Sequence, residues 1–304
     1  ARLDIENTDF EIIFDHENGN HCHRDIKSNS ECAVRKTPEV MVDDWHVFKA
    51  MDDVSKMTKL HLRSPWRNGR NTYSPKINNN DVQELVKRID DCKSLWILIL
   101  SWNYLTTASS VALVKGVVTH TTIVHLVLHN TNFGEKTGVA LGQALTTNTF
   151  LHTLELNGND LNERGGTAII RGLKTNTTLK QLLLGRNNLG NNIGGVIETD
   201  LASNASLEAL GLQHNPLGNN AGVAIATWLA TNTVLQKLNL RHSNLGDVSG
   251  VAIAMALTTN TTLQKLFLGS NELGEKAGSA LVTALTQNSS LVELDVSHNA
   301  GISP

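Results

Sequence analysis

Apolar and polar positions along the chain repeat with a period of 28 residues. The first apolar residue of each unit stands, without insertion or deletion, at Leu95, Ile123, Leu151, Leu179, Leu207, Leu235, Leu263 or Leu291. Leucine returns three residues later in every unit and five residues later in all but the last, which has Val296. This spacing predicts that each unit opens with a short strand that turns one face toward a core.

The second half of each unit changes to helical spacing. In the unit of residues 263–290, Ala280, Leu281, Ala284 and Leu285 fall on one face of a predicted helix that packs inward. A glycine column near the helix start would let neighbouring backbones approach; it comprises Gly138, Gly166, Gly194, Gly222, Gly250 and Gly278. An asparagine column after the helix end predicts a left-handed C-cap; it comprises Asn148, Asn176, Asn204, Asn232, Asn260 and Asn288.

A second asparagine column follows each strand, eight residues after the first apolar position. It comprises Asn103, Asn159, Asn187, Asn215, Asn271 and Asn299, with Thr131 and Ser243 in the two remaining units. The chain turns away from the strand there, so we expect buried amides that bond backbone groups on both sides.

One strand–helix unit cannot bury its apolar faces alone, so neighbouring units must stack and their strands form one parallel sheet. A helix is wider than the strand spacing of about 4.8 Å. The sequence therefore predicts an α/β fold, a curved solenoid or horseshoe with a parallel β-sheet on the concave face and helices on the convex face.

The repeated L-x-x-L-x-L, followed by N-x-L-G, resembles the leucine-rich repeat family in its 28-residue ribonuclease-inhibitor-like form. The N-T-T-L entry to the strand is similar to the repeats of NOD-like receptors, although their nucleotide-binding motif G-x-x-x-x-G-K-[ST] does not occur in this sequence. The resemblance covers about residues 57–304 and implies protein binding on the concave face, with no site common to the family.

Two regions depart from the period. Residues 1–56 carry 13 acids and 7 bases and are predicted to form an acidic N-terminal segment with a capping helix. Residues 57–304 are predicted to form the solenoid of about nine strands, with a basic inserted loop at residues 63–76. That loop contains Trp66, Arg67 and Arg70, which either contact an acidic partner or a phosphate, or pack back over the front end.

Contact residues are expected two, four and six positions after the first apolar residue, on the concave face, and seven positions after it, at the rim. These columns vary from unit to unit, whereas the core columns stay leucine. Because Trp and Arg dominate binding energy at interface centres, we predict Trp102, Arg186, Arg241 and Phe267 as anchors. Glu155 and Asp295 would set the charge. The predicted set is completed by His129, His214 and His242; the alternative is that each residue is simply a solvated strand residue.

Neither an enzyme nor a metal site is predicted. Glu155 and Asp295 are too far apart for paired acid–base work, and no G-x-S-x-G or H-E-x-x-H occurs in the sequence. His21, Cys22, His23 and Cys32 match no usual zinc spacing, and whether Cys22 and Cys32 are bonded stays open. His214 and His242 should lie about 5 Å apart, but we predict no metal and no cofactor.

The net charge of −3 gives no support to nucleic acid as a partner, and no apolar run is long enough to span a membrane. We predict a non-enzymatic module that binds a partner protein on its concave face. The alternative is a scaffold subunit of a larger assembly, docked through an open C-terminal edge. A cytoplasmic location is favoured over a secreted protein carrying glycans in its N-x-[ST] sequons, at Asn176, Asn204, Asn260 and Asn288.

Overall fold

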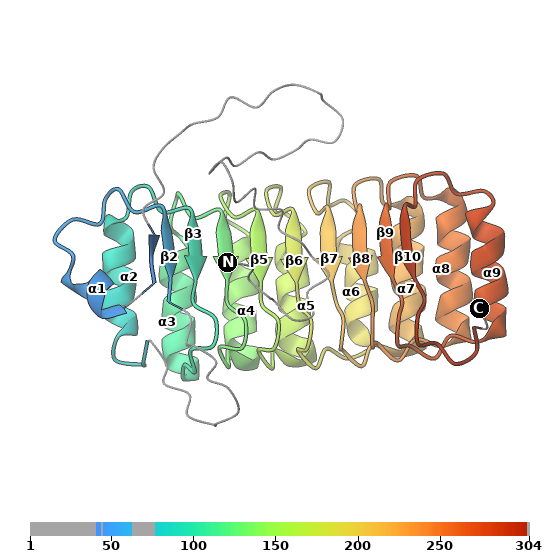
Figure 1. Ribbon diagram of the computed structural model, residues 1–304, viewed down its shortest axis with the longest axis horizontal. Helices are drawn as coiled ribbons and strands as arrows, with labels where there is room; N and C mark the ends of the chain where they lie inside the picture. Colours follow the sequence, from blue (N-terminus) through green and yellow to red (C-terminus); the bar gives the residue numbers. More distant parts are fainter. Residues whose placement is uncertain (1–40, 44, 63–76, 303–304) are drawn as a thin grey trace, which may run out of the picture. The chain divides into compact units, whose positions relative to one another are not determined.

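The computed structural model describes residues 41–43, 45–62 and 77–302. Their ten strands form one sheet in sequence order, and every neighbouring pair is parallel. Helices α2–α9 stand in a row on one side of this sheet (Figure 1). The α/β solenoid predicted from the 28-residue period is confirmed.

The strands are short, and a single helix follows each of them except β10, the last element of the described region. Their bounds are β1 Met41–Val42, β2 Lys59–His61, β3 Ile97–Ile99, β4 His125–Val127, β5 Thr153–Glu155, β6 Gln181–Leu183, β7 Ala209–Gly211, β8 Lys237–Asn239, β9 Lys265–Phe267 and β10 Glu293–Asp295. The helices are α1 Trp45–Ala50, α2 Val82–Asp91, α3 Thr107–Val118, α4 Gly134–Leu145, α5 Asn162–Gly172, α6 Asn192–Asp200, α7 Gly218–Thr231, α8 Asp247–Thr259 and α9 Glu275–Leu285.

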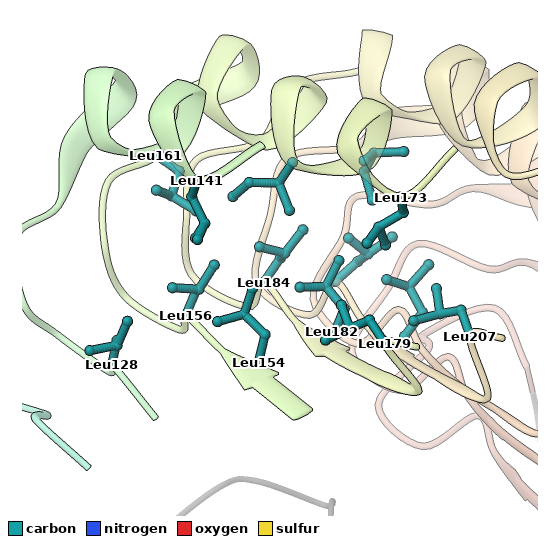
Figure 2. Close-up of a cluster of buried hydrophobic side chains, with 14 of the residues drawn as sticks. Leu128, Leu141, Leu154, Leu156, Leu161, Leu173, Leu179, Leu182, Leu184 and Leu207 are labelled. Atoms are coloured by element: carbon teal, nitrogen blue, oxygen red, sulfur yellow. The ribbon is translucent and has the colours of Figure 1, made fainter. Parts of the chain in front are cut away.

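The sheet keeps the sequence repeat in strict register. Leu154 of β5 lies beside Leu182 of β6, which in turn lies beside Leu210 of β7. All three are fully buried and belong to the cluster that fills the space between the sheet and the helices (Figure 2). The leucine columns are therefore the core, and each unit buries its apolar face against its neighbours.

Adjacent helices approach each other closely at the glycine column. A Cβ on Gly194 would stand 2.4 Å from the Cα of Ala221 on the next helix, and one on Gly138 would stand 2.8 Å from the Cα of Gly165. The predicted close approach is confirmed for these helices. Gly278, on the last helix α9, differs, because a Cβ there would make only an ordinary contact of 3.5 Å with the side chain of Ile302.

The asparagines after the strands form a hydrogen-bonded ladder, as predicted. Asn187 is fully buried; its Nδ2 donates to the carbonyls of Leu156 and Gly185 at 2.9 and 3.1 Å. Its Oδ1 accepts from the backbone N–H groups of Asn159 and Leu161 at 2.9 and 3.4 Å. The side chain thus satisfies backbone groups of both its own unit and the preceding one, which explains its recurrence.

The asparagine column after the helices also bonds backbone, but the predicted left-handed C-cap is wrong. Asn232 and Asn260 are extended, with φ of −74° and −76°, and no residue of the column has a positive φ. Instead the Nδ2 of Asn176 donates to the carbonyls of Leu145 and Asn148, while its Oδ1 accepts from the N–H of Leu179. The asparagine side chain reaches the carbonyls of the preceding unit from an extended backbone, so no left-handed turn is needed.

The same bonds bear on the N-x-[ST] sequons. A glycan would be joined to Nδ2, and in each sequon this atom already donates two hydrogen bonds to carbonyls of the preceding unit, in Asn176, Asn204, Asn260 and Asn288. Glycosylation of the folded repeats would therefore break hydrogen bonds that join these asparagines to the preceding unit.

The front of the described region is a short helix set on the core. Trp45 and Phe48 of α1 are buried in the same cluster as the leucines. Arg88 of α2 donates through Nη2 to the carbonyl of Phe48 at 2.8 Å and to that of Met51 at 2.6 Å. The strand β1, which the sequence pattern did not predict, adds one strand before the repeats. The division of the chain at residue 56 stays a prediction, and the inserted loop at 63–76 lies outside the described residues.

Candidate functional site

The sheet has a second face, opposite the core, which we call the outer sheet face. It is formed by residues two, four and six positions after the first apolar residue of each unit. Leu183 and Phe267, at the fourth position, are 1% and 2% exposed, yet neither belongs to the core cluster. The six residues of this column from β4 to β9 are all buried, so Glu155 and Phe267 are not solvated strand residues.

Phe267 is buried because cations lie over its ring. The guanidinium carbon of Arg241 is 4.9 Å and the ammonium of Lys237 is 5.7 Å from the ring centroid. Arg241 also bridges to the edge strand, donating from Nε to Asp295 Oδ2 at 2.6 Å. Three of the predicted contact residues therefore form one cluster, namely Arg241 in the turn after β8, Phe267 on β9 and Asp295 on β10. Phe267 forms its floor, so a partner would meet the cations above it.

The carboxyl group of Asp295 is held in its ionised form. Burial opposes ionisation, but the hydroxyl and backbone N–H of Ser297 and the guanidinium of Arg241 outweigh it and hold the pKa of Asp295 below its usual range. The Arg241–Asp295 ion pair is partly buried, with 29% and 16% of the two side chains exposed. The cluster is thus a fixed dipole on the outer sheet face.

A second cluster joins His129 and Glu155, on neighbouring strand units. Nε2 of His129 lies 2.7 Å from Oε2 of Glu155, and Glu155 is buried. A carboxylate only accepts, so Nε2 carries the proton. The other ring nitrogen, Nδ1, is buried without a hydrogen-bond partner, as are Nε2 of Gln181 and Oε1 of Gln213. Three of the four such side-chain atoms in the described part of the chain thus lie on the outer sheet face; the fourth is Nε of Arg88.

The seventh position of each unit forms a line along the rim of the sheet. We call it the rim row, and it comprises Trp102, Asn130, Gly158, Arg186, His214, His242, Ser270 and His298. All eight residues have a positive φ, between 52° and 71°. Each of the first seven donates its backbone N–H to a carbonyl of the next unit, so the row is held in the same register as the strands. None of the eight is buried.

In the middle of the rim row, three side chains contact one another. Nη2 of Arg186 lies 3.3 Å from Nε2 of His214. The His214 and His242 rings are stacked, with centroids 4.2 Å apart and planes 14° from parallel. Burial first, and then the charges of Arg186 and His242, lower the pKa of His214 to about 4. At neutral pH His214 is therefore uncharged.

The structure brings most of the predicted contact residues into these three groups. Trp102 belongs to the rim row but lies three units before Arg186, outside the group of Arg186, His214 and His242. Trp66, Arg67 and Arg70 fall in residues that are not described. The sequence reasoning did not single out Gln181 or Asn157, whose Oδ1 accepts from the N–H of Gly185 at 2.7 Å. Their place in the second and sixth positions was the available signal.

The described residues offer little conventional chemistry. They contain no group of three or more His, Cys, Asp or Glu side chains that could hold a metal ion. His21, Cys22, His23 and Cys32 lie outside them. Burial raises the pKa of the Cys92 thiol to about 11, so it stays protonated. Within the described ranges, no helix has the length and apolar character needed to cross a membrane.

Comparison with known proteins agrees with the repeat. A family model described as Leucine Rich repeat matches residues 147–169, 203–226, 231–254, 259–282 and 287–304. The starting residues of these matches are separated by one or two 28-residue periods. No curated protein matches the sequence.

Several solved structures are similar. The yeast complex of Rad7 and Elc1 matches with 17% identity and a TM-score of 0.50, over 79% of this chain and 56% of the matched chain. Leiomodin-1 actin-binding site 2 matches at 20% identity and a TM-score of 0.40, over 44% of this chain and 78% of that one.

The tropomodulin C-terminal domain of Caenorhabditis elegans matches at 14% identity and a TM-score of 0.40, over 48% of this chain and 92% of that one. At such identities a likeness shows the fold alone. Repeat period, strand register and family model agree: this chain is a leucine-rich repeat solenoid protein built of ribonuclease-inhibitor-like 28-residue repeats.

Proposed function

We propose that this chain is a non-enzymatic protein-binding module whose partner contacts the outer sheet face and the rim row. The observation that carries the proposal is the concentration of unsatisfied buried polar atoms on that face, namely His129 Nδ1, Gln181 Nε2 and Gln213 Oε1. A buried polar atom without a partner costs about 1–3 kcal/mol. Contact with a partner can reorient these three side chains and supply the missing bonds, which recovers that energy.

The contrast between the two sheet faces supports the same proposal. The core columns repeat leucine in unit after unit, because every unit packs against the same neighbours. The outer columns change in charge and size at each step, with an acid–imidazole pair on β4–β5 and a cation–aromatic cluster on β8–β10. Such an irregular surface is suited to one particular protein surface rather than to a repeating polymer.

The geometry favours binding over catalysis. Paired acid–base chemistry needs two groups within reach of one substrate. Glu155 and Asp295 stand on β5 and β10, roughly 24 Å apart at the usual strand spacing. Each carboxylate is already bonded to a basic side chain on its own part of the sheet.

Site-specific photo-cross-linking tests the proposal. A photoreactive amino acid is placed at residue 130 or 270 in the rim row, and in matched variants at residue 164 or 227 on the exposed side of α5 or α7. Native lysate is irradiated, and the adducts are identified by mass spectrometry. We expect one protein to be captured from both rim positions and from neither helix position. Capture of the same protein from the helix positions alone would refute the proposal.

A further inference from the structure

Three columns of the repeat contain non-glycine residues with a positive φ. The eleventh position has one, Asn162, and the other two columns follow different rules. At the ninth position the backbone is left-handed in four units, and the residues there are Asn132, Asp160, Asn188 and Asn244. At the seventh position, the rim row, the backbone is left-handed in all eight units. Asn and Asp are the non-glycine residues that tolerate this conformation best, because their short polar side chains bond local backbone.

The rim row follows that preference only in part. Asn130, Gly158 and the three histidines are residue types that occur often in left-handed backbone, whereas Trp102, Arg186 and Ser270 are disfavoured there. At the ninth position, two residues later in the same turn, every residue with left-handed backbone is Asn or Asp, as expected where the conformation alone decides the residue type. The side chains of Trp102, Arg186 and Ser270 therefore have a use that outweighs their conformational cost, since strained backbone in a well-packed fold is typical of functional positions.

The chemistry of that use follows from the stack of Arg186, His214 and His242. A guanidinium has donors only, so Nε2 of His214 must accept from Arg186, and the proton of the neutral ring is on Nδ1. Nδ1 has no hydrogen-bond partner among the described residues. The guanidinium of Arg186 and the ring of His242 are exposed on either side. The stack thus presents hydrogen-bond donors held in a line by packing.

The rim row contains no carboxylate. Its fixed charge is the guanidinium of Arg186, and the positive groups that face His214 are Arg186 and His242. We propose that the stack formed by Arg186, His214 and His242 is the docking site for an acidic segment of the partner protein. The carboxylates of that segment accept hydrogen bonds from these three side chains. This inference rests on the proposed function and specifies the partner's chemistry.

Binding of a synthetic peptide to the full chain tests the inference. The probe is a ten-residue oligoglutamate, with oligoglutamine of equal length for comparison, titrated in about 150 mM salt, where exposed charges are screened beyond about 8 Å. We expect saturable binding of oligoglutamate only. Arg186→Gln and His242→Gln should each weaken it about tenfold, as the loss of one charge-assisted contact implies.

Arg164→Gln is the matched control, because it removes one exposed positive charge from α5, where Arg164 pairs with Glu135. It should leave binding unchanged. In the bound state a nearby carboxylate should also raise the pKa of His214 above about 4, which NMR titration of the imidazole measures. Circular dichroism confirms that each variant is folded.

Three results would overturn the inference: no saturable binding of oligoglutamate, equal weakening by Arg164→Gln and Arg186→Gln, or an unchanged pKa of His214 in the complex. Rim cross-links to a partner protein without oligoglutamate binding would refute the acidic partner while leaving the proposed function intact. Conversely, oligoglutamate binding without any rim cross-link to a protein would refute the proposed function while leaving the binding site for acidic peptides in place.

Discussion

Asn187 and Arg186 are neighbours in one turn of the solenoid, yet they belong to regions that follow opposite rules. Asn187 is fully buried, bonds backbone of two units and has an equivalent asparagine in five other units. Arg186 is exposed, has a φ of 56° and is matched by a different residue in nearly every unit. Within a repeat, recurrence marks what stacking requires, and variation marks the positions that stacking leaves available for a partner.

The largest effect should come from the ladder. Asn187→Ala would leave two backbone N–H groups and two carbonyls of adjacent units without this partner, and we expect it to lower the free energy of unfolding by about 3 kcal/mol or more. Denaturant unfolding measures the loss. The control, Asn188→Ala in the exposed left-handed position next to it, should cost only about 1 kcal/mol. Equal losses would mean that the ladder is not what sets the repeat.

The next effect separates packed from open glycines on one helix. A Cβ at Gly194 would overlap the backbone of Ala221, whereas one at Gly195 would meet nothing within 4 Å. Gly194→Ala should therefore destabilise by about 1–3 kcal/mol through overpacking. Gly195→Ala should stabilise by up to about 1 kcal/mol, because alanine is the better helix former. Thermal unfolding of the two variants decides, and the same sign for both would contradict the close approach of α6 and α7.

A smaller effect of opposite sign is expected in the rim row. Arg186→Asn places a residue suited to left-handed backbone there, and we expect a gain of up to about 1 kcal/mol, because non-glycine residues with positive φ carry strain of that order. The reverse change at the ninth position, Asn244→Arg, should destabilise by a similar amount. If Arg186→Asn also destabilises, the arginine serves the fold.

The smallest effect is a pH dependence. The folded pKa of His214 is about 4, below the usual 6.5. Below pH 6.5 the unfolded chain gains a proton that the folded chain does not, so this residue lowers stability as pH falls from 6.5 to about 4 and has no effect above that window. His214→Asn should therefore lose less stability than the parent over this range. Denaturant unfolding of the parent and of His214→Asn at pH 7 and pH 5 measures the difference. If both proteins lost the same free energy of unfolding between the two pH values, the imidazole of His214 would not be desolvated.

The sequence predicted the fold well because stacking imposes a period on it. The leucine columns, the glycine contacts such as Gly194, and the ladder through Asn187 each follow from one local requirement repeated in every unit. It failed where contacts join side chains of different units. The cations over Phe267 and the contact of Arg186 with His214 depend on side chains that periodicity does not specify. The neighbouring positions of His214 and His242, in contrast, follow from the strand spacing.

The central claim is that the rim row serves contact and not folding. The most direct test is one variant, Arg186→Asn with His214→Asn and His242→Asn, measured both for unfolding free energy and for cross-linking to its partner from residue 270, in the same row. The account predicts stability equal to or above that of the parent and loss of the cross-link. A variant that is markedly less stable, or that keeps the cross-link, would contradict it.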